Sequence, residues 1–151
     1  MSDPIALISS AIITETELSA LILSAKGFVE PGAPLFGRFS NGCCHIWIGL
    51  SSDELEIAIV DEGEDYLAKI TRLLGGPPRT QVTVEISRTE GSERLALEFA
   101  ILFSSTWPAI MDMLDGCAGF ESRLLTRSDL LRRQSVGAGV RVCAADAPQA
   151  A

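Results

Sequence analysis

The sequence has few of the groups on which most catalytic sites depend. Aromatic residues make up 6% of its 151 residues, and there is one histidine, His45. It contains no G-x-S-x-G, G-x-x-x-x-G-K-S/T, H-E-x-x-H, G-x-G-x-x-G or EF-hand pattern. The enzyme classes that these motifs define are therefore disfavoured, and any site that needs an imidazole must use His45.

Long apolar runs are also missing. The run 95–103 is nine residues long and contains Glu98, whereas a bilayer-spanning helix needs about twenty apolar residues. Near the start, Asp3 and the polar segment 14–17 break the pattern of a secretory signal. The sequence therefore predicts no membrane span, and we expect a cytoplasmic protein.

Cysteine is present without the spacing of a metal site or a disulfide framework. The four cysteines are the adjacent pair Cys43 and Cys44 and the single residues Cys117 and Cys143. This spacing matches neither a zinc pattern nor a small secreted scaffold. Adjacent cysteines can form a strained redox-active disulfide, but cysteine is also a common small buried side chain. We expect reduced thiols and no metal or cofactor.

Positive charge is scarce. Twenty acidic residues against twelve basic ones give a net charge of -8, which repels phosphate backbones and anionic lipid surfaces. Residues 1–115 hold 17 acids and 7 bases, whereas residues 116–151 hold 3 and 5. Nucleic acid and membrane are therefore poor partners, and the negative charge is concentrated in the first three quarters of the chain.

What the chain does have is enough apolar surface for one globular domain. Hydrophobic residues make up 47% of it, with 7 prolines and 13 glycines. We expect the domain to occupy residues 1–116. Residues 117–143 would then form an extension with a short helix at 126–133, and residues 144–151 a flexible tail.

The first half of the chain predicts a strand, a helix and a hairpin. The strand is expected at 5–13, the helix begins at Thr14 or Thr16 and ends at Gly27, and 28–34 is a connection. Asn41-Gly42 indicates a type I′ turn between strands at 35–40 and 43–50. Residues 51–60 alternate like a strand but can equally begin a helix.

The second half alternates helices and strands. A helix is expected at 64–74 before Gly75-Gly76-Pro77-Pro78, and the alternation of 81–87 predicts a strand. Ser92 is expected to cap a further helix that ends at Trp107-Pro108, and 109–114 is a last strand.

This order predicts an α+β fold, a two-layer sandwich with a mixed, mostly antiparallel sheet of five to six strands. About three helices would cover one face and leave the other open. Ile46, Ile48 and Leu50 alternate with His45 and Trp47, and the aliphatic set is expected to face the core. The residues expected on the open face are His45, Trp47, Thr83, Glu85 and Asp112.

Two clusters are candidate functional sites. Cys43 and His45 share one side of their strand, so a thiol and imidazole pair is one candidate, although no orienting group is recognisable. The other is an acidic run, which has three readings: a solvated face, a divalent-cation site, or a surface that docks a basic protein. The acidic run consists of Asp53, Glu54, Glu56, Asp61, Glu62, Glu64 and Asp65. Together with His45, Trp47 and Glu85, these seven residues form the expected partner-binding set.

A set of short segments resembles an uncharacterised family of small bacterial α/β proteins. They are 45–48 with Asp53-Glu54, 73–78, 94–100 and Trp107-Pro108, and the resemblance covers about 43 to 116. Some similar acidic proteins accompany polymorphic toxins as immunity proteins. The resemblance implies a non-catalytic protein-binding domain whose partner is a basic toxin domain, and it carries over no catalytic residue.

Two other functions remain open. One is a small enzyme or ligand-binding domain that uses Cys43 and His45. The other is a structural subunit whose open sheet face is covered by a second copy, as a homodimer.

Overall fold

A computed structural model of the chain describes residues 3–32, 35–51, 63–113 and 124–137. The strands are β1 (Asp3–Ser9), β2 (Phe28–Glu30), β3 (Phe36–Asn41), β4 (Cys44–Leu50), β5 (Thr80–Ile86), β6 (Ala109–Asp112) and β7 (Leu124–Leu125). The helices are α1 (Glu15–Ser24), α3 (Glu64–Leu74), α4 (Ser92–Thr106) and α5 (Arg127–Ser135). None of these helices is long and apolar enough to cross a membrane.

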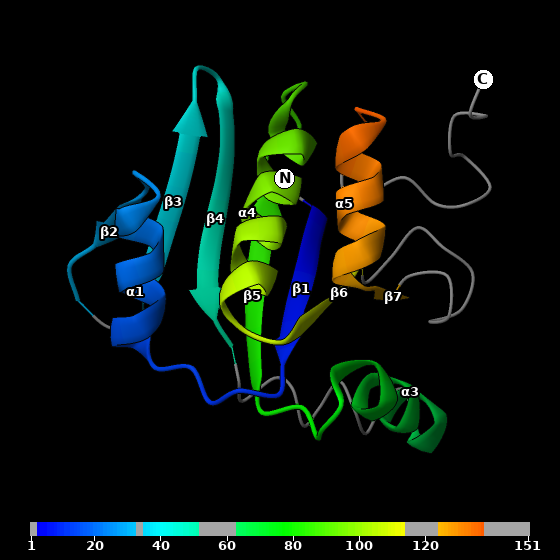
Figure 1. Ribbon diagram of the computed structural model, residues 1–151. Helices are drawn as coiled ribbons and strands as arrows, with labels where there is room; N and C mark the ends of the chain where they lie inside the picture. Colours follow the sequence, from blue (N-terminus) through cyan, green and yellow to red (C-terminus); the bar gives the residue numbers. More distant parts are fainter. Residues whose placement is uncertain (1–2, 33–34, 52–62, 114–123, 138–151) are drawn as a thin grey trace.

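The strands form one antiparallel sheet in the order β2-β3-β4-β5-β1-β6-β7 (Figure 1). The expected α+β fold is confirmed, but the sheet has seven strands rather than five or six. The additional strands are the two short edges, β2 and β7. Residues 28–34 were expected to be a connection, which is wrong for Phe28–Glu30, because these residues pair with β3.

One face of the sheet is covered by α1, α4 and α5. Their apolar side chains join those of the strands in a single core. Its fully buried members include Leu18, Ile22, Phe103 and Leu130 from the helices, and Ile5, Leu7, Ile46, Ile48, Val82 and Val84 from the strands. Because the buried strand residues alternate, their neighbours along each strand face the other way.

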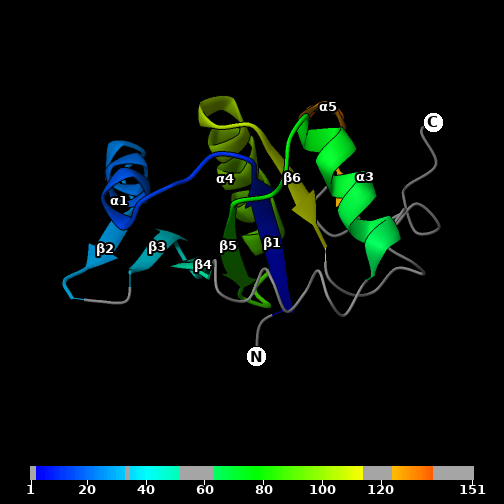
Figure 2. The same ribbon diagram turned by 90° about the horizontal axis from the view of Figure 1, so that it is seen from below.

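The other face is covered at one end by α3. Tyr66 and Ile70 pack on Ala6, Ile8, Ile110 and Leu124. Figure 2 shows α3 near β6, far from β2 and β3 at the other end of the sheet. The expectation that the helices lie on one face is therefore wrong for α3. Among the described residues, no helix covers the same face over β2, β3, β4 and β5, which we call the open half.

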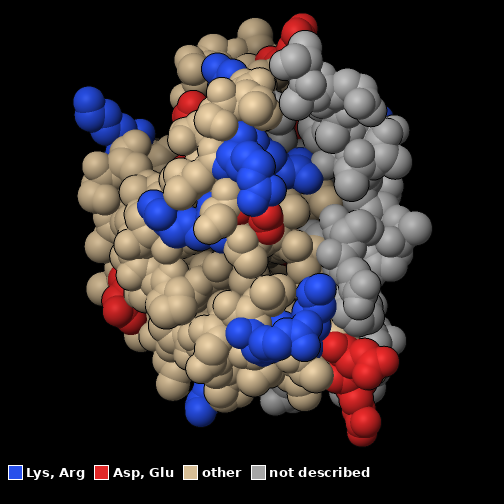
Figure 3. Space-filling view, turned by 45° about the vertical axis from the view of Figure 1, so that its right-hand side comes forward, with Lys and Arg blue, Asp and Glu red and all other residues tan. Residues whose placement is uncertain are grey.

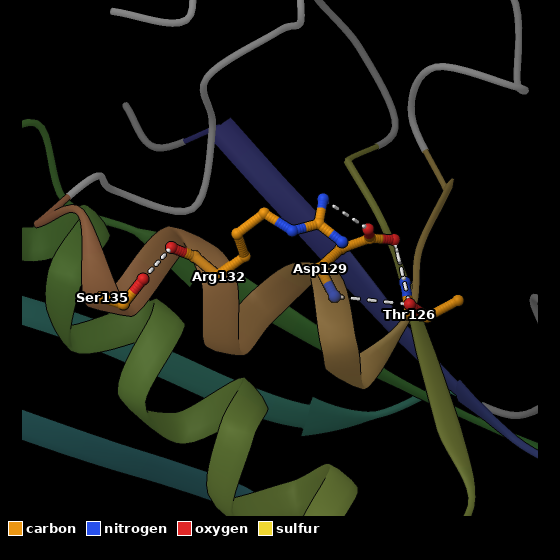
Figure 4. Close-up of polar contacts among 4 residues, drawn as sticks. All are labelled: Thr126, Asp129, Arg132 and Ser135. Carbon is orange, nitrogen blue, oxygen red and sulfur yellow. Dashed lines mark hydrogen bonds and ion pairs between the residues drawn. The ribbon is translucent and has the colours of Figure 1, made fainter. Parts of the chain in front are cut away.

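Helix starts follow the sequence signals closely. Thr14 caps α1 in a reciprocal capping box with Glu17. Thr126 caps α5 in the same way with Asp129 (Figure 4). The cap of α4 differs from expectation, because Gly91, in the left-handed region at φ 96°, takes the N-cap position. Ser92 is instead the first helical residue, and its buried hydroxyl pairs with that of Ser87.

The hairpin between β3 and β4 is present, but its turn lies one residue later than expected. Asn41 pairs with Cys44, so the two central residues are Gly42 and Cys43. Of these, only Gly42 has a positive φ, at 64°. A type I′ turn needs positive φ at both central residues, whereas type II′ has glycine at the first. The expected type I′ turn is therefore wrong, and the pattern is that of type II′.

Other boundaries shift without changing the face that each strand presents. β1 begins at Asp3 and ends at Ser9, so the expected strand at 5–13 is wrong beyond Ser9. The segment beyond Gly116 contributes β7 and α5, and Leu125 and Leu130 belong to the main core. The sheet and its core thus extend past the expected boundary at 116, and the expected short helix is present as α5. Residues 144–151 lie outside the described residues.

Candidate functional site

The open half carries one row of side chains that crosses four strands. Phe28 of β2 pairs with Arg38 of β3, Arg38 with Trp47 of β4, and Trp47 with Glu85 of β5. Directly paired residues on one face have Cβ atoms about 4.5–5.5 Å apart. We call these four residues the Trp47 row. It places an indole between a guanidinium on one side and a carboxylate on the other.

Three contacts hold the aromatic side chains of this surface in place. The Arg38 guanidinium carbon lies 5.2 Å from the centre of the Phe28 ring, a cation–π geometry. The His45 ring stacks beside Trp47, with centroids 6.0 Å apart and planes at 28°. Ser40 Oγ lies 2.8 Å from His45 Nδ1. Ser40 therefore orients the imidazole, and the imidazole supports one side of the indole.

This surface is open and mixed in charge. Phe28 is 47% exposed and Phe36 42%, which is unusual for phenylalanine, while Trp47 and His45 are partly buried. Arg38 and Glu85 are exposed, and among the described residues neither forms an ion pair. Both charges are therefore available to groups outside this part of the chain.

The structure brings together four of the five residues expected on the open face. His45, Trp47, Thr83 and Glu85 lie on the open half. Asp112 is on the same side of the sheet but is fully buried, and Tyr66 Oη donates a 2.6 Å hydrogen bond to its carboxylate. Its expected place on the open face is wrong, because α3 covers that end of the sheet.

The acidic run is only partly described. Glu64 and Asp65 are exposed in the first turn of α3, where carboxylates interact favourably with the helix dipole. The other five acids of the run lie outside the described residues: Asp53, Glu54, Glu56, Asp61 and Glu62. Nearly all of the segment 51–60, which the sequence left open between strand and helix, lies outside them too. The described members of the partner-binding set are therefore His45, Trp47, Glu64, Asp65 and Glu85.

The two adjacent cysteines have different surroundings. Cys43 is exposed in the turn, whereas Cys44 is partly buried and its thiol donates to the carbonyl oxygen of Glu90 at 3.0 Å. The hydrogen-bond partner found for the imidazole ring of His45 is Ser40, not Cys43. Within the described part of the chain, no three His, Cys, Asp or Glu side chains are grouped as a metal site would require.

Four residues of this surface were not predicted from the sequence: Phe28, Phe36, Arg38 and Ser40. A signal was present for three of them, since Phe36, Arg38 and Ser40 alternate with Gly37 and Phe39 along β3. Phe28 was not recognisable, because β2 has only three residues and precedes two prolines.

Two cavities formed by described residues lie away from the Trp47 row. One of about 360 Å³ is formed by the loop between β5 and α4, around Arg88, Glu90 and Glu93. Another, of about 330 Å³, lies between the end of α1, β3 and α4, where Phe39, Phe99 and Leu102 contribute. Neither of these two cavities is lined by a residue of the row, and the row itself lies on a sheet face.

Basic side chains gather on a different surface. Figure 3 shows groups of Lys and Arg on the side of the molecule that carries α5, and α5 contributes Arg127, Arg132 and Arg133. Arg132 lies 3.3 Å from Asp129. Burial lowers the pKa of Arg133, against the opposing attraction of Asp129. These charges are partly engaged within α5 and are separate from the open half.

Comparison with known proteins adds no relative: no family model, curated protein or solved structure matches the chain.

Proposed function

We propose that the protein is a non-catalytic protein-binding domain and that the open half of its sheet is the contact surface. The observation that carries this proposal is the Trp47 row, in which Trp47 is the cross-strand partner of both Arg38 and Glu85 on the open half of the sheet. Binding energy in protein interfaces is concentrated in a few residues, most often Trp, Tyr and Arg, inside a polar rim. The row has this composition.

The local contacts favour binding over catalysis. His45 is stacked on Trp47 and bonded to Ser40, its cross-strand partner. Both contacts position aromatic rings, which lowers the entropy cost of forming an interface. Ser40 and His45 do form a hydroxyl and imidazole pair, but a nucleophilic site also needs a third group that orients the imidazole. Among the described residues, no side chain is hydrogen-bonded to the other ring nitrogen of His45.

A finer form of the proposal is that the partner is basic and that the protein neutralises it as a cytoplasmic immunity protein. The net charge of -8 and the exposed Glu64, Asp65 and Glu85 support a basic partner. Complementary charge raises the association rate and disfavours wrong partners. A toxin domain is the partner that the resemblance to immunity proteins implies.

Affinity capture tests the proposal. The immobilised full-length protein and its Trp47→Thr variant are exposed to an extract of the cells that encode it, and retained proteins are identified by mass spectrometry. The matched control is Leu23→Thr, which removes a 57% exposed apolar side chain from α1, away from the open half. A retained protein is then purified and its binding kinetics are measured.

We expect Trp47→Thr to bind at least about tenfold more weakly, mainly through faster dissociation. Glu85→Arg should slow association with a basic partner at low salt. Leu23→Thr should bind as the wild type does. Equal binding by the wild type and Trp47→Thr would remove the open half as the contact surface.

A further inference from the structure

We infer that the open half also binds a second copy of this chain, face to face, about a two-fold axis that runs along β4 at Trp47. The inference rests on the proposed function, because it uses the same protein-binding surface. It adds the identity of one partner and the geometry of the contact.

Opposite charges flank Trp47 across the sheet. Arg38 lies one strand to one side of Trp47 and Glu85 one strand to the other, at the same level along the strands. Neighbouring strands are about 4.8 Å apart, so the backbones of Arg38 and Glu85 are at nearly equal distances from β4. The row therefore has a positive charge on one side of β4 and a negative charge at the matching position on the other side.

A two-fold axis along β4 matches these charges with those of a second copy. The rotation turns the second sheet over and reverses its strand order, while residues keep their level along the strands. Arg38 then faces the partner's Glu85, and Glu85 faces the partner's Arg38. Trp47 faces the partner's Trp47. The contact is isologous, and one surface supplies both halves of each ion pair.

The alternative two-fold axis in the interface plane runs across the strands. It would keep the strand order and place each charge opposite its own copy, Arg38 against the partner's Arg38 and Glu85 against the partner's Glu85. Like charges at an interface are disfavoured. The charges of the row thus select the axis along β4, which also gives the nearly aligned strand directions common in packed sheets.

The surface beside Trp47 has room for a second indole. Gly49 follows Trp47 on the same side of β4, and a Cβ atom built there would have no neighbour within 4 Å. Stacked sheets lie about 10 Å apart, a separation in which two facing tryptophans must lie past each other. The axis keeps both tryptophans at one level, so they would lie on opposite sides of it, and the open space at Gly49 lets both indoles tilt along the strand. Phe36, which pairs with Gly49, supplies an exposed apolar wall.

The dimer should be weak, because the contact spans only part of one sheet. A stable interface usually buries about 800 Å² on each partner, and a patch about four strands wide is at or below that size. We expect a dissociation constant of roughly 10–100 µM. A second protein that uses the same row would have to displace the second copy.

Charge reversal tests this geometry on the full chain. Sedimentation equilibrium is measured over roughly 5–500 µM, around the dissociation constant expected for an interface of this size, for the wild type, Arg38→Glu, Glu85→Arg and the double variant. Each single reversal creates two like-charged contacts, so dimerisation should weaken by at least about tenfold. The double variant should dimerise as the wild type does. Arg127→Glu, an exposed reversal on α5, controls for net charge.

The decisive sample is an equal mixture of the two single variants. One copy then carries Glu at both positions and the other carries Arg at both, so every cross-contact joins opposite charges. We expect heterodimers at wild-type strength from two proteins that dimerise poorly alone. Circular dichroism establishes that each variant is folded.

The outcomes separate this inference from the proposed function. Dimers that are insensitive to the reversals would place the contact elsewhere and overturn the inference. A wild type that is monomeric throughout, yet captures another protein in a Trp47-dependent way, would also overturn it and leave the proposed function standing. A monomer with no Trp47-dependent capture would overturn both.

Discussion

Two halves of one sheet face have different surfaces. At one end, β1, β6 and β7 present small or aliphatic side chains, and α3 packs on them through Tyr66 and Ile70. At the other end, β2 to β5 present Phe28, Arg38 and Trp47, with no described helix above them. The covered half stabilises this fold, whereas the open half has the composition of an interface.

The polar contacts of the two halves also differ in how far they are exposed to solvent. In the covered half, the Tyr66 hydroxyl and the Asp112 carboxylate are fully buried and hydrogen-bonded at 2.6 Å. In the open half, the Ser40 and His45 pair is exposed. A buried polar group is costly when its partner is lost, while an exposed one turns to water. Substitutions should therefore affect stability in the covered half and binding in the open half.

The largest expected effect is in the covered half. Ile70→Ala should lower the free energy of unfolding by about 2–5 kcal/mol, because Ile70 is fully buried between α3 and the sheet. Leu67→Ala, on the same helix but 36% exposed, should change it by less than about 1 kcal/mol. Urea denaturation measures both. Equal losses would contradict the packing of α3 through Ile70.

A pair of glycine substitutions compares the helix-covered face with the open half. In Gly27→Ala, the new Cβ would lie 2.6 Å from Ile22 and 2.8 Å from Phe39, so unfolding free energy should fall by about 1–3 kcal/mol. Gly49→Ala meets no atom within 4 Å and should be neutral or stabilising by about 0.5–1 kcal/mol. Thermal denaturation distinguishes them. A destabilised Gly49→Ala would show that the open half is packed against something.

The smallest expected effect on stability is in the Trp47 row. Trp47→Thr keeps a good strand former and loses the stacking on His45, so the free energy of unfolding should fall by about 1 kcal/mol or less. Urea denaturation measures this loss beside the binding data for the same variant. A loss as large as that of Ile70→Ala would mean that Trp47 is part of the folding core.

Much of the local structure could be predicted from the sequence. The helix at 64–74 has the expected bounds, Thr14 caps α1, and Val82, Val84 and Ile86 are buried on one side of β5. These features depend on neighbouring residues, through caps, periodicity and alternation. The same alternation placed His45, Trp47 and Glu85 on one side of their strands.

The errors arose where a distant partner decides the structure. β2 and β7 are too short to show a pattern and exist because β3 and β6 offer hydrogen bonds to them. The turn at Gly42 and Cys43 was misplaced by one residue because the strand register, rather than the Asn-Gly pair alone, sets it.

By itself, the sequence determined which side chains share a strand face, the bounds of α3 and the cap of α1, because these follow from spacing along the chain. Only the tertiary structure decided that α3 covers one end of the second face, that Asp112 is buried beneath it, and that Arg38, Trp47 and Glu85 form one row. Strand order and helix placement depend on contacts between residues far apart in sequence, whose energies no local pattern encodes.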